Sequence, residues 1–296
     1  MKQYITVITG PTASGKTEVS IQVAKKLNAE IISFDSRQCY SELNIGVARP
    51  TPGQLAAIPH HFIANRSIHD SYSAASFATE ARSKIEELVK KQKNVVLCGG
   101  TGLYLKAILE GFSVLPEIKT EIREYVESVW EKDQLTGLID LIRNLDEEAL
   151  AKLDPKNTAR LKRTAEILLC SEKQTLKEIM APKMAGIEYP YKIYCLNPDR
   201  SMLYSNIESR VDNMLEQGLL EEVKRLTLFK HLPVLKTVGY SELFEFLDGQ
   251  TTLAFAVDKI KQHTRNYAKR QITWFKNQTN ASMVNLDQII EFVGAL

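Results

Sequence analysis

The sequence predicts an α/β fold: a parallel β-sheet covered by helices, with a helical segment inserted into it. Three observations support this prediction. Short apolar runs typical of buried strands alternate with helical patterns up to residue 109. Residues 117–179 then carry helical patterns and no convincing strand. An apolar strand at Tyr191–Leu196 and several long helices follow, so the sheet resumes after the insertion.

The elements before the insertion are predicted from apolar runs and from the turn or capping residues beside them. The run Tyr4–Ile8 ends at Thr9-Gly10, and Ser73 is a typical N-cap for the helix that follows it. The expected strands are 4–8, 29–33, 61–63 and 94–98, and the expected helices are 17–27, 73–91 and 101–109. Residues 36–59 show little periodicity, which indicates a long functional loop.

After the insertion, the same criteria predict two strands and four helices. The expected strands are 191–196 and 283–286, and the expected helices are 200–217, 219–229, 238–247 and 252–276. We therefore expect an α/β catalytic core at 1–112 and 189–296 and a helical insertion domain at 113–188. The many carboxylates of residues 117–148 are read as the solvated face of that insertion.

Composition excludes several classes of protein. The formal net charge is +2, so any RNA site must be a local basic patch. The four cysteines are far apart and form no CxxC pair, which argues against a disulfide framework and a zinc finger. No run approaches the ~18 apolar residues of a membrane span, and the N-terminus has no apolar signal core. We expect a cytoplasmic protein without a membrane partner.

A phosphate-binding loop is the most specific motif. Gly10-Pro11-Thr12-Ala13-Ser14-Gly15-Lys16-Thr17 matches GxxxxGK[ST] and lies between a predicted strand and a predicted helix. The glycines let successive backbone N–H groups converge on phosphate oxygens, and the helix N-terminus favours the anion. Lys16 can neutralise phosphate charge and Thr17 can bind Mg²⁺. ATP is the usual ligand of such a loop, but any diphosphate ester fits it.

The strand at 94–98 does not end in the carboxylate of a Walker B motif. It ends in Gly99-Gly100-Thr101-Gly102, a second glycine-rich turn that enters a helix. Without the aspartate that holds Mg²⁺ in P-loop ATPases, an ATPase or GTPase is disfavoured. Thr101 offers a hydroxyl near the phosphate end of the sheet, although the glycines alone would also make a tight turn.

Asp35 follows the second predicted strand, so it is expected at the same carboxyl edge of the sheet as the phosphate loop. A carboxylate there can bind Mg²⁺, act as a general base or cap a turn, and the residues alone leave these three roles open. The flanking Ser36, Arg37, Gln38 and Tyr40 can hydrogen-bond to a base or stack on it.

Several segments together resemble the tRNA dimethylallyltransferase (isopentenyltransferase) family. They are GPTASGKT at 10–17, DSRQCY at 35–40, IGVARPT at 45–51, PHHFI at 59–63, GGTGLY at 99–104, DPKNTARLKRTAEIL at 154–168, LYSNIESRVDNML at 203–215, TVGYSEL at 237–243 and AKRQITWFK at 268–276. The resemblance spans nearly the whole chain. Arg37 departs from it, because many members have a hydrophobic residue there. No zinc finger follows the last helix, as in bacterial members.

The resemblance implies a P-loop kinase-like core with a helical insertion and a specific reaction. The family moves a dimethylallyl group from dimethylallyl diphosphate to N6 of adenosine 37, in the anticodon loop of tRNAs that read codons beginning with U. Asp35 matches the catalytic aspartate, Arg210 matches an arginine that contacts the diphosphate, and Thr101 is expected to assist catalysis. Mg²⁺ on Thr17 is the expected cofactor, and a monomer is the expected state.

The tRNA is expected to bind through the Asp35 loop and through several basic or loop residues. Arg160 and Arg163 share a helix face, and the last long helix carries a basic stripe with interleaved aromatics. The expected contacts to the anticodon stem-loop are Asp35, Ser36, Arg37, Gln38, Thr101, Arg123, Ala159, Arg160, Leu161, Lys162, Arg163, Thr237, Val238, Gly239, Tyr240 and Arg270.

Three other functions fit part of the pattern. A P-loop small-molecule kinase would need a carboxylate for Mg²⁺ at the end of the strand at 94–98. An adenylate prenyltransferase would use the same loop and aspartate but little RNA surface. A non-catalytic RNA-binding module would leave the phosphate loop without a purpose.

Overall fold

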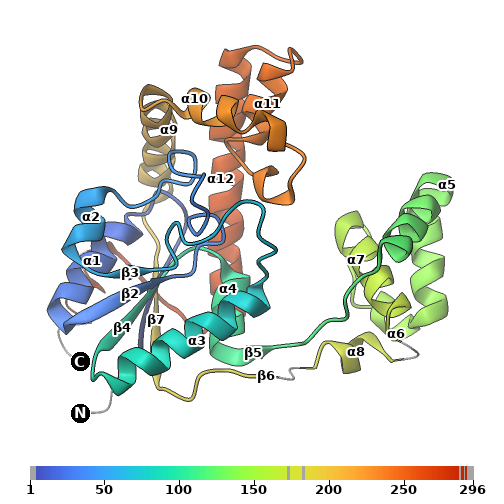
Figure 1. Cartoon of the computed structure of the whole chain (residues 1–296), viewed down its shortest axis with the longest axis horizontal. Helices are drawn as coiled ribbons and strands as arrows, with labels where there is room; N and C mark the ends of the chain where they lie inside the picture. The colour runs from blue at the N-terminus through green and yellow to red at the C-terminus, as the bar shows by residue number, and fades with distance from the viewer. Residues whose placement is uncertain (1–4, 172–173, 182–183, 287, 290, 292–296) are drawn as a thin grey trace. The chain divides into compact units, whose positions relative to one another are not determined.

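The computed structural model describes residues 5–171, 174–181, 184–286, 288, 289 and 291 (Figure 1). The chain forms two compact units, one from Met1–Leu105 and Glu188–Leu296 and the other from Lys106–Ile187. The expected boundaries of the insertion, 112/113 and 188/189, lie close to those of the second unit. Among the described residues, no helix has the length and apolarity to cross a membrane.

A six-stranded parallel sheet forms the centre of the first unit (Figure 1). Its strand order is β3-β2-β4-β1-β7-β8. The strands are β1 (Ile5–Thr9), β2 (Ala29–Ser33), β3 (His60–His61), β4 (Asn94–Cys98), β7 (Tyr191–Leu196) and β8 (Ser282–Val284). All described residues of β1 are buried, as expected for a central parallel strand covered on both faces. The parallel-sheet prediction is confirmed. Tyr4, the first residue of the expected strand 4–8, lies outside the described residues.

The helices of the first unit largely follow the predicted ranges. They are α1 (Lys16–Leu27), α2 (Pro52–Ala57), α3 (Ala74–Lys90), α9 (Arg200–Glu216), α10 (Leu219–Arg225), α11 (Ser241–Leu247) and α12 (Leu253–Gln278), and α4 (Gly102–Glu110) continues into the second unit. Ser73 caps α3 as predicted, its side chain accepting a hydrogen bond from the backbone N–H of Ser76. Helix α12 packs against both α9 and α11.

Several predictions for this unit are wrong in detail. The strands expected at 61–63 and 283–286 lie at His60–His61 and Ser282–Val284, and the helix expected at 219–229 ends at Arg225. Residues 36–59 contain α2, whose signal was present in the sequence: Thr51 and Gln54 form a capping box around Pro52. The helix predicted from Val238 begins only at Ser241, because Gly239 has a φ of 95°, which an α-helix does not accept. Short 3₁₀ helices precede it at Thr227–Phe229 and Pro233–Leu235.

The second unit is helical, as predicted for 117–179. It contains α5 (Thr120–Leu145), α6 (Glu147–Leu150), α7 (Thr158–Leu169), α8 (Leu176–Ile179) and a small antiparallel pair, β5 (Gly111–Phe112) with β6 (Met184–Ala185). Helix α5 breaks at Gln134, where φ is 51° and ψ is −137°. Apolar side chains of α5 and α7, including Val126, Ile142 and Leu161, form its core.

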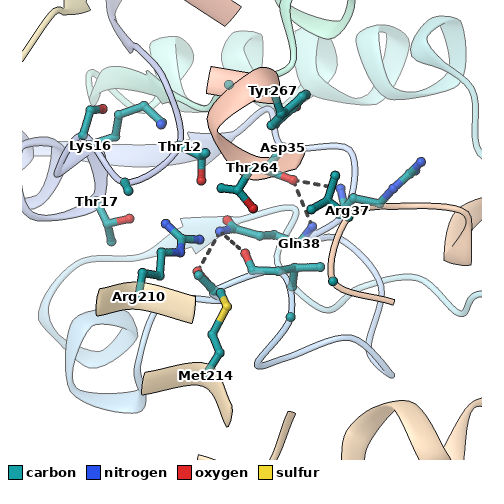
Figure 2. Close-up of a pocket in the computed structure, with 18 of the residues that line it drawn as sticks. Thr12, Lys16, Thr17, Asp35, Arg37, Gln38, Arg210, Met214, Thr264 and Tyr267 are labelled. Carbon is teal, nitrogen blue, oxygen red and sulfur yellow. Dashed lines mark hydrogen bonds between the residues drawn. The ribbon is translucent and has the colours of Figure 1, made fainter. Parts of the chain in front are cut away.

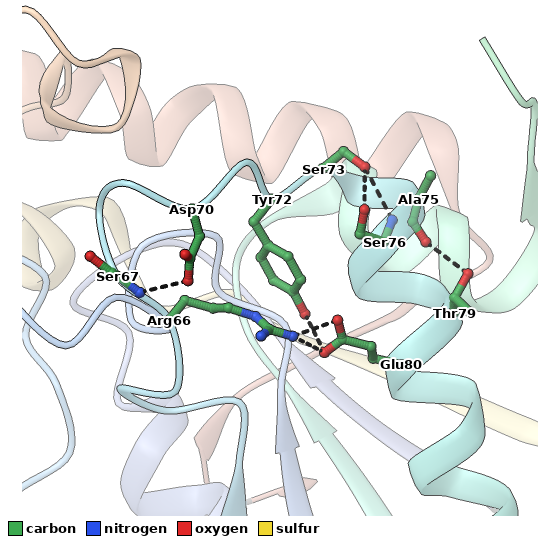
Figure 3. Close-up of polar contacts among 9 residues, drawn as sticks. All are labelled: Arg66, Ser67, Asp70, Tyr72, Ser73, Ala75, Ser76, Thr79 and Glu80. Carbon is green, nitrogen blue, oxygen red and sulfur yellow. Dashed lines mark hydrogen bonds and ion pairs between the residues drawn. The ribbon is translucent and has the colours of Figure 1, made fainter. Parts of the chain in front are cut away.

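A polar network around Arg66 holds the loop after β2, and Figure 3 shows its contacts with Tyr72 and Glu80. The backbone of Arg66 donates to the carbonyl oxygen of Cys39 at 2.9 Å and accepts from the N–H of Ser41 at 2.7 Å. Its guanidinium pairs with the carboxylate of Glu80 on α3, and the Tyr72 hydroxyl donates to the same carboxylate at 3.2 Å. The segment containing Arg66 therefore anchors residues 39–41 to α3.

The next part of that loop is held by one buried acid, Glu222 of α10. Its carboxylate accepts hydrogen bonds from the backbone N–H groups of Asn44, Ile45 and Gly46, at 2.8 to 3.2 Å. It also accepts from the hydroxyl of Tyr240 at 2.7 Å. Four donors thus depend on a single side chain that is only 2% exposed.

Replacing Glu222 with alanine is expected to lower the free energy of unfolding by about 3 kcal/mol, because it removes the acceptor of these donors. Urea denaturation measures the change. Glu221→Ala is the matched control, since this neighbour is exposed and forms a surface ion pair with Lys224, three residues later. Equal stability losses for the two variants would contradict the assigned role of Glu222.

Candidate active site

A cavity of about 590 Å³ lies at the carboxyl ends of β1, β2 and β4 (Figure 2). Residues from the phosphate loop, the Asp35 loop, α9, α12 and the segment before α11 line it. The lining is Thr12–Glu18, Asp35–Gln38, Gly46–Ala48, Gln54, Gly100, Arg210, Val211, Met214, Thr237–Gly239, Ile260, Thr264, Tyr267 and Gln271. The sheet edge therefore brings the predicted phosphate loop and Asp35 to a single cavity, as expected for an open α/β sheet.

The phosphate loop connects β1 to α1 and presents its backbone N–H groups to this cavity. Positive φ angles at Ala13 (63°) and Gly15 (84°) turn the chain around the end of α1. Gly10 is required where the loop passes β7, because a Cβ atom there would come within 2.9 Å of the carbonyl oxygen of Leu196. Within the described part of the chain, the N–H groups of residues 13–17 donate to no protein acceptor. These converging donors suit an anion.

Lys16 supplies the positive charge of the loop. Its ammonium group donates to the carbonyl oxygen of Pro11 at 2.6 Å. Burial lowers the pKa of Lys16 to about 8, and the nearby Arg210 guanidinium acts in the same direction. A bound anion would offset both effects by stabilising the charged form, so Lys16 and Arg210 make this part of the cavity suited to a phosphate group.

Asp35 lies one residue beyond Phe34, after the end of β2. Its Oδ1 atom accepts hydrogen bonds from the backbone N–H groups of Arg37 (2.9 Å) and Gln38 (3.3 Å), so it caps the turn 35–38 (Figure 2). Its Oδ2 atom accepts no hydrogen bond from the described residues. One carboxylate can thus fix its own loop through one oxygen and offer the other to a ligand in the cavity.

Thr101 contacts the Asp35 loop and is not itself part of the cavity lining. Its hydroxyl accepts a hydrogen bond from the backbone N–H of Ser36 at 3.1 Å and donates to the hydroxyl of Ser36 at 3.3 Å. The second glycine-rich turn is therefore fastened to the Asp35 loop. Both amide hydrogens of Gln38 are used within the protein, on the carbonyl oxygens of Val47 (3.2 Å) and Ala48 (2.9 Å).

Arg210 projects from α9 into the space between the phosphate loop and Gln38 (Figure 2). Its guanidinium makes no hydrogen bond or ion pair with any residue that the structure describes. Burial lowers the pKa of Arg210, and the Asp35 carboxylate opposes that shift. A free guanidinium opposite the phosphate loop is suited to bidentate contact with phosphate oxygens.

Apart from Thr101, described above, the predicted RNA residues of the first unit divide into three groups. Residues 35–38 and 237–239 line the cavity. Arg270 is exposed on α12, with its guanidinium 5.8 Å from the ring centre of Tyr267. Tyr240 is completely buried and hydrogen-bonded to Glu222, so its side chain is not exposed to RNA, and the tRNA contact expected of this residue stays a prediction. A Cβ atom at position 46 would come within 2.6 Å of the Tyr240 ring, so this ring packs directly against the loop at Gly46 and supports it.

The remaining predicted RNA residues belong to the second unit. Leu161 is completely buried in the core of that unit, so its side chain does not face RNA, and the tRNA contact expected of this residue stays a prediction. Arg123, Ala159, Arg160, Lys162 and Arg163 are exposed or half-buried. The Lys162 ammonium pairs with Glu127 at 2.7 Å and lies 4.8 Å from the ring centre of Trp130. Arg160 and Arg163 line a separate cavity of about 470 Å³ within this unit.

Sequence reasoning missed several residues of the central cavity. Met214, Thr264 and Gln271 come from long helices and were not among the predicted site residues. Tyr267 was expected only as one of the aromatics interleaved with the basic stripe of α12, and that stripe was the signal in the sequence that could have led to its neighbours. Gln271 is 7% exposed and hydrogen-bonds to both glycine-rich turns.

Comparison with known proteins gives consistent matches. The family model described as IPP transferase matches residues 38–278. The chain is 43% identical over 296 residues to the tRNA dimethylallyltransferase of Chloroherpeton thalassium, covering 97% of this chain and 91% of that protein. It is 41% identical to the tRNA dimethylallyltransferase of Flavobacterium johnsoniae, covering 94% and 92% of the two chains.

Solved structures agree. The full-length tRNA isopentenylpyrophosphate transferase of Bacillus halodurans is 33% identical, with a TM-score of 0.72 over 99% of this chain and 95% of that chain. A eukaryotic dimethylallyltransferase acting on tRNA is 25% identical, with a TM-score of 0.80 over 99% and 76%. The sequence, the fold and the phosphate loop facing Asp35 lead to one conclusion: this chain belongs to the IPP transferase family, with the tRNA dimethylallyltransferases.

Proposed function

We propose that the protein transfers a dimethylallyl group from dimethylallyl diphosphate to N6 of adenosine 37 in the anticodon loop of tRNAs that read codons beginning with U. One observation carries the proposal: free N–H donors of residues 13–17 and the Asp35 carboxylate line the same cavity. A diphosphate and an adenine amine can therefore meet inside it. Membership of the family supports the substrates.

The reaction needs a base and an anion site. The adenine amine is a weak nucleophile because its lone pair is delocalised into the ring. As its nitrogen bonds to C1 of the dimethylallyl group, the C1–O bond breaks and diphosphate leaves with the bonding electrons. The Oδ2 atom of Asp35 accepts the proton that the amine loses. Lys16, Arg210 and the N–H groups of residues 13–17 stabilise the growing negative charge on the diphosphate.

Mg²⁺ fits this site only as an ion shared with the substrate. No cluster of three or more metal-binding side chains occurs among the described residues. Mg²⁺ usually keeps several waters and takes one or two protein oxygens together with substrate phosphates. We propose that the Thr17 hydroxyl, on the cavity wall, holds it. When bound, Mg²⁺ would neutralise diphosphate charge.

We also propose that the enzyme is a cytoplasmic monomer. All four cysteines are free, which fits a reducing compartment. Light scattering on the purified protein tests the monomer, and a mass of about twice the 33.4 kDa of the chain would contradict it.

A cationic surface on α9 and α12 suits the tRNA backbone. Arg200 donates to the Tyr204 hydroxyl at 3.0 Å, and the Lys269 ammonium lies 5.9 Å from the centre of the Tyr204 ring. Burial would raise the pKa of Tyr204, but the hydrogen bonds from Arg200 and Lys269 outweigh it and lower the pKa. Asn206 of the same helix reaches the carbonyl oxygen of Ala13, so this surface adjoins the phosphate loop.

Replacing Lys269 with alanine is therefore expected to raise KM for tRNA about threefold to tenfold and to leave kcat unchanged. The slope of log KM against log salt concentration should fall by about 1, the effect of one lost phosphate contact. Lys276→Ala is the control, because this lysine is exposed on the same helix outside the surface. Identical salt slopes for parent and Lys269→Ala would exclude a phosphate contact.

A direct assay tests the proposed activity. The protein is incubated with Mg²⁺, dimethylallyl diphosphate and unmodified tRNA, and digested tRNA is analysed by mass for prenylated adenosine. Parallel reactions contain AMP instead of tRNA, or ATP instead of dimethylallyl diphosphate. We expect product only with tRNA and dimethylallyl diphosphate. Prenylated AMP would favour an adenylate prenyltransferase, and phosphate transfer from ATP would favour a kinase.

A further inference from the structure

Gln271 joins the two glycine-rich turns of the cavity. Its Oε1 atom accepts a hydrogen bond from the backbone N–H of Thr12, in the phosphate loop, at 2.8 Å. Its Nε2 atom donates to the carbonyl oxygen of Gly100, in the turn after β4, at 2.9 Å. These partners lie 259 and 171 residues away in the sequence. One buried side chain of α12 thus bridges the loops that follow β1 and β4.

The contact leaves little room for movement. A Cβ atom at position 100 would lie 2.3 Å from Nε2 of Gln271, so the lack of a side chain at Gly100 is what lets the amide come this close. The amide orientation is also fixed, because the opposite one would set two donors against each other at Thr12. The Gln271 side chain therefore fixes the distance between the two turns, with its Oε1 atom bound to the N–H of Thr12 and its Nε2 atom bound to the carbonyl oxygen of Gly100.

The spacing matters for the proposed chemistry. Thr12 directly precedes residues 13–17, whose free N–H groups would face the diphosphate. Gly100 immediately precedes Thr101, which hydrogen-bonds to Ser36 beside Asp35. The bridge therefore runs from the leaving-group side of the cavity through Gln271 to the side that holds the base.

From this geometry we infer that Gln271 is a positioning residue for the transfer reaction, one that sets the distance between the diphosphate cradle and the Asp35 loop. The inference rests on the function proposed above. Gln271 acts through the backbone atoms of Thr12 and Gly100 and takes no part in proton transfer. Its loss is expected to lower kcat/KM for dimethylallyl diphosphate while affinity for tRNA stays unchanged.

The test uses two substitutions that separate packing from hydrogen bonding. Gln271→Met keeps the length of the side chain and removes both hydrogen bonds. Leaving two buried polar groups without partners corresponds to a loss of roughly fivefold to a hundredfold, expected in kcat/KM for dimethylallyl diphosphate. Gln262→Met is the matched control, because Gln262 is exposed on the same helix. It should retain the parent activity.

Gln271→Glu supplies a readout that a merely structural role would not give. A protonated glutamic acid can accept from Thr12 and donate to Gly100, as the amide does, whereas the carboxylate cannot donate. The ratio of variant to parent kcat/KM should therefore rise as pH falls from about 8.5 to about 6, because burial raises the pKa of a carboxyl group. The parent and the variant share the other ionisable groups of the cavity, Lys16, Asp35, Arg210 and Tyr267. Taking the ratio therefore cancels the contribution of these groups to the pH profile.

The outcomes are distinct. A loss in Gln271→Met together with recovery of Gln271→Glu in acid supports the bridge. Parent-like activity of Gln271→Met, or a flat or falling ratio for Gln271→Glu, overturns it. If Gln271→Met does not fold, the Gln271→Glu ratio decides alone. If the parent transfers no dimethylallyl group, the proposed function fails; binding of inorganic diphosphate to parent and Gln271→Met then decides the bridge, with equal affinities overturning it.

Discussion

Asp35→Asn is expected to lower kcat by a factor of about 10² to 10⁴, the usual contribution of a general base. Asparagine keeps an oxygen that can accept from the N–H groups of Arg37 and Gln38, so the turn remains capped. Only the capacity to take a proton is lost. The dissociation constant for tRNA should change less than about twofold, because phosphate contacts supply most of the affinity for a nucleic acid.

Single-turnover kinetics with saturating tRNA and dimethylallyl diphosphate measure this effect on the chemical step. Asp35→Ala is the companion variant, since it removes the cap as well as the base. It should abolish turnover while tRNA binding is largely kept. A near-normal rate in either variant would show that another group takes the proton.

Lys16→Met is expected to lower kcat/KM for dimethylallyl diphosphate by a factor of about 10² to 10³, the typical effect of removing a charged or oriented donor from a transition state. The methionine preserves the apolar stem and removes the ammonium group. The parent should also show a pH dependence that this variant lacks.

The direction of that dependence follows from the pKa of Lys16, which burial lowers to about 8. The ammonium form binds the diphosphate, and binding raises its pKa. The affinity for dimethylallyl diphosphate should therefore be highest and constant below about pH 8. It should fall as the pH rises above that value, by at most about tenfold per pH unit for one proton. Titration calorimetry from neutral to alkaline pH measures the affinity.

Lys25→Met is the control for this series. Lys25 is exposed in the last turn of the same helix α1, outside the cavity lining. This variant should bind dimethylallyl diphosphate like the parent at every pH. If Lys16→Met retained the alkaline loss of affinity, a different group would be responsible for it.

Strands were the most predictable part of the fold. The ranges 29–33, 94–98 and 191–196 were predicted without error, because an apolar run between turn residues is a local signal. Helix α2 was missed although its capping box is local, since its six residues bury none of their side chains and show no periodicity. The start of α11 depended on the backbone conformation of Gly239, which composition does not reveal.

In the site, too, the residues with a local sequence signal were predicted and those that depend on distant contacts were not. The phosphate loop and Asp35 follow strands directly, so sheet topology alone brings them together. Gln271 could not be found from sequence because both of its partners are backbone groups on distant loops. Tyr240 and Leu161 were predicted to contact RNA together with their neighbours in the sequence, and the sequence pattern did not reveal that both side chains are buried.

The sheet places β1 between β4 and β7, so a strand from the beginning of the chain pairs with one that is made only after the insertion. During synthesis on a ribosome, β1 has no neighbour on that side until Leu196 has emerged from the exit tunnel. The cavity forms later still, because α12, which contributes part of its lining, must first be synthesised. Nascent chains thus spend most of translation with an exposed strand edge, a period in which a chaperone would protect them from aggregation.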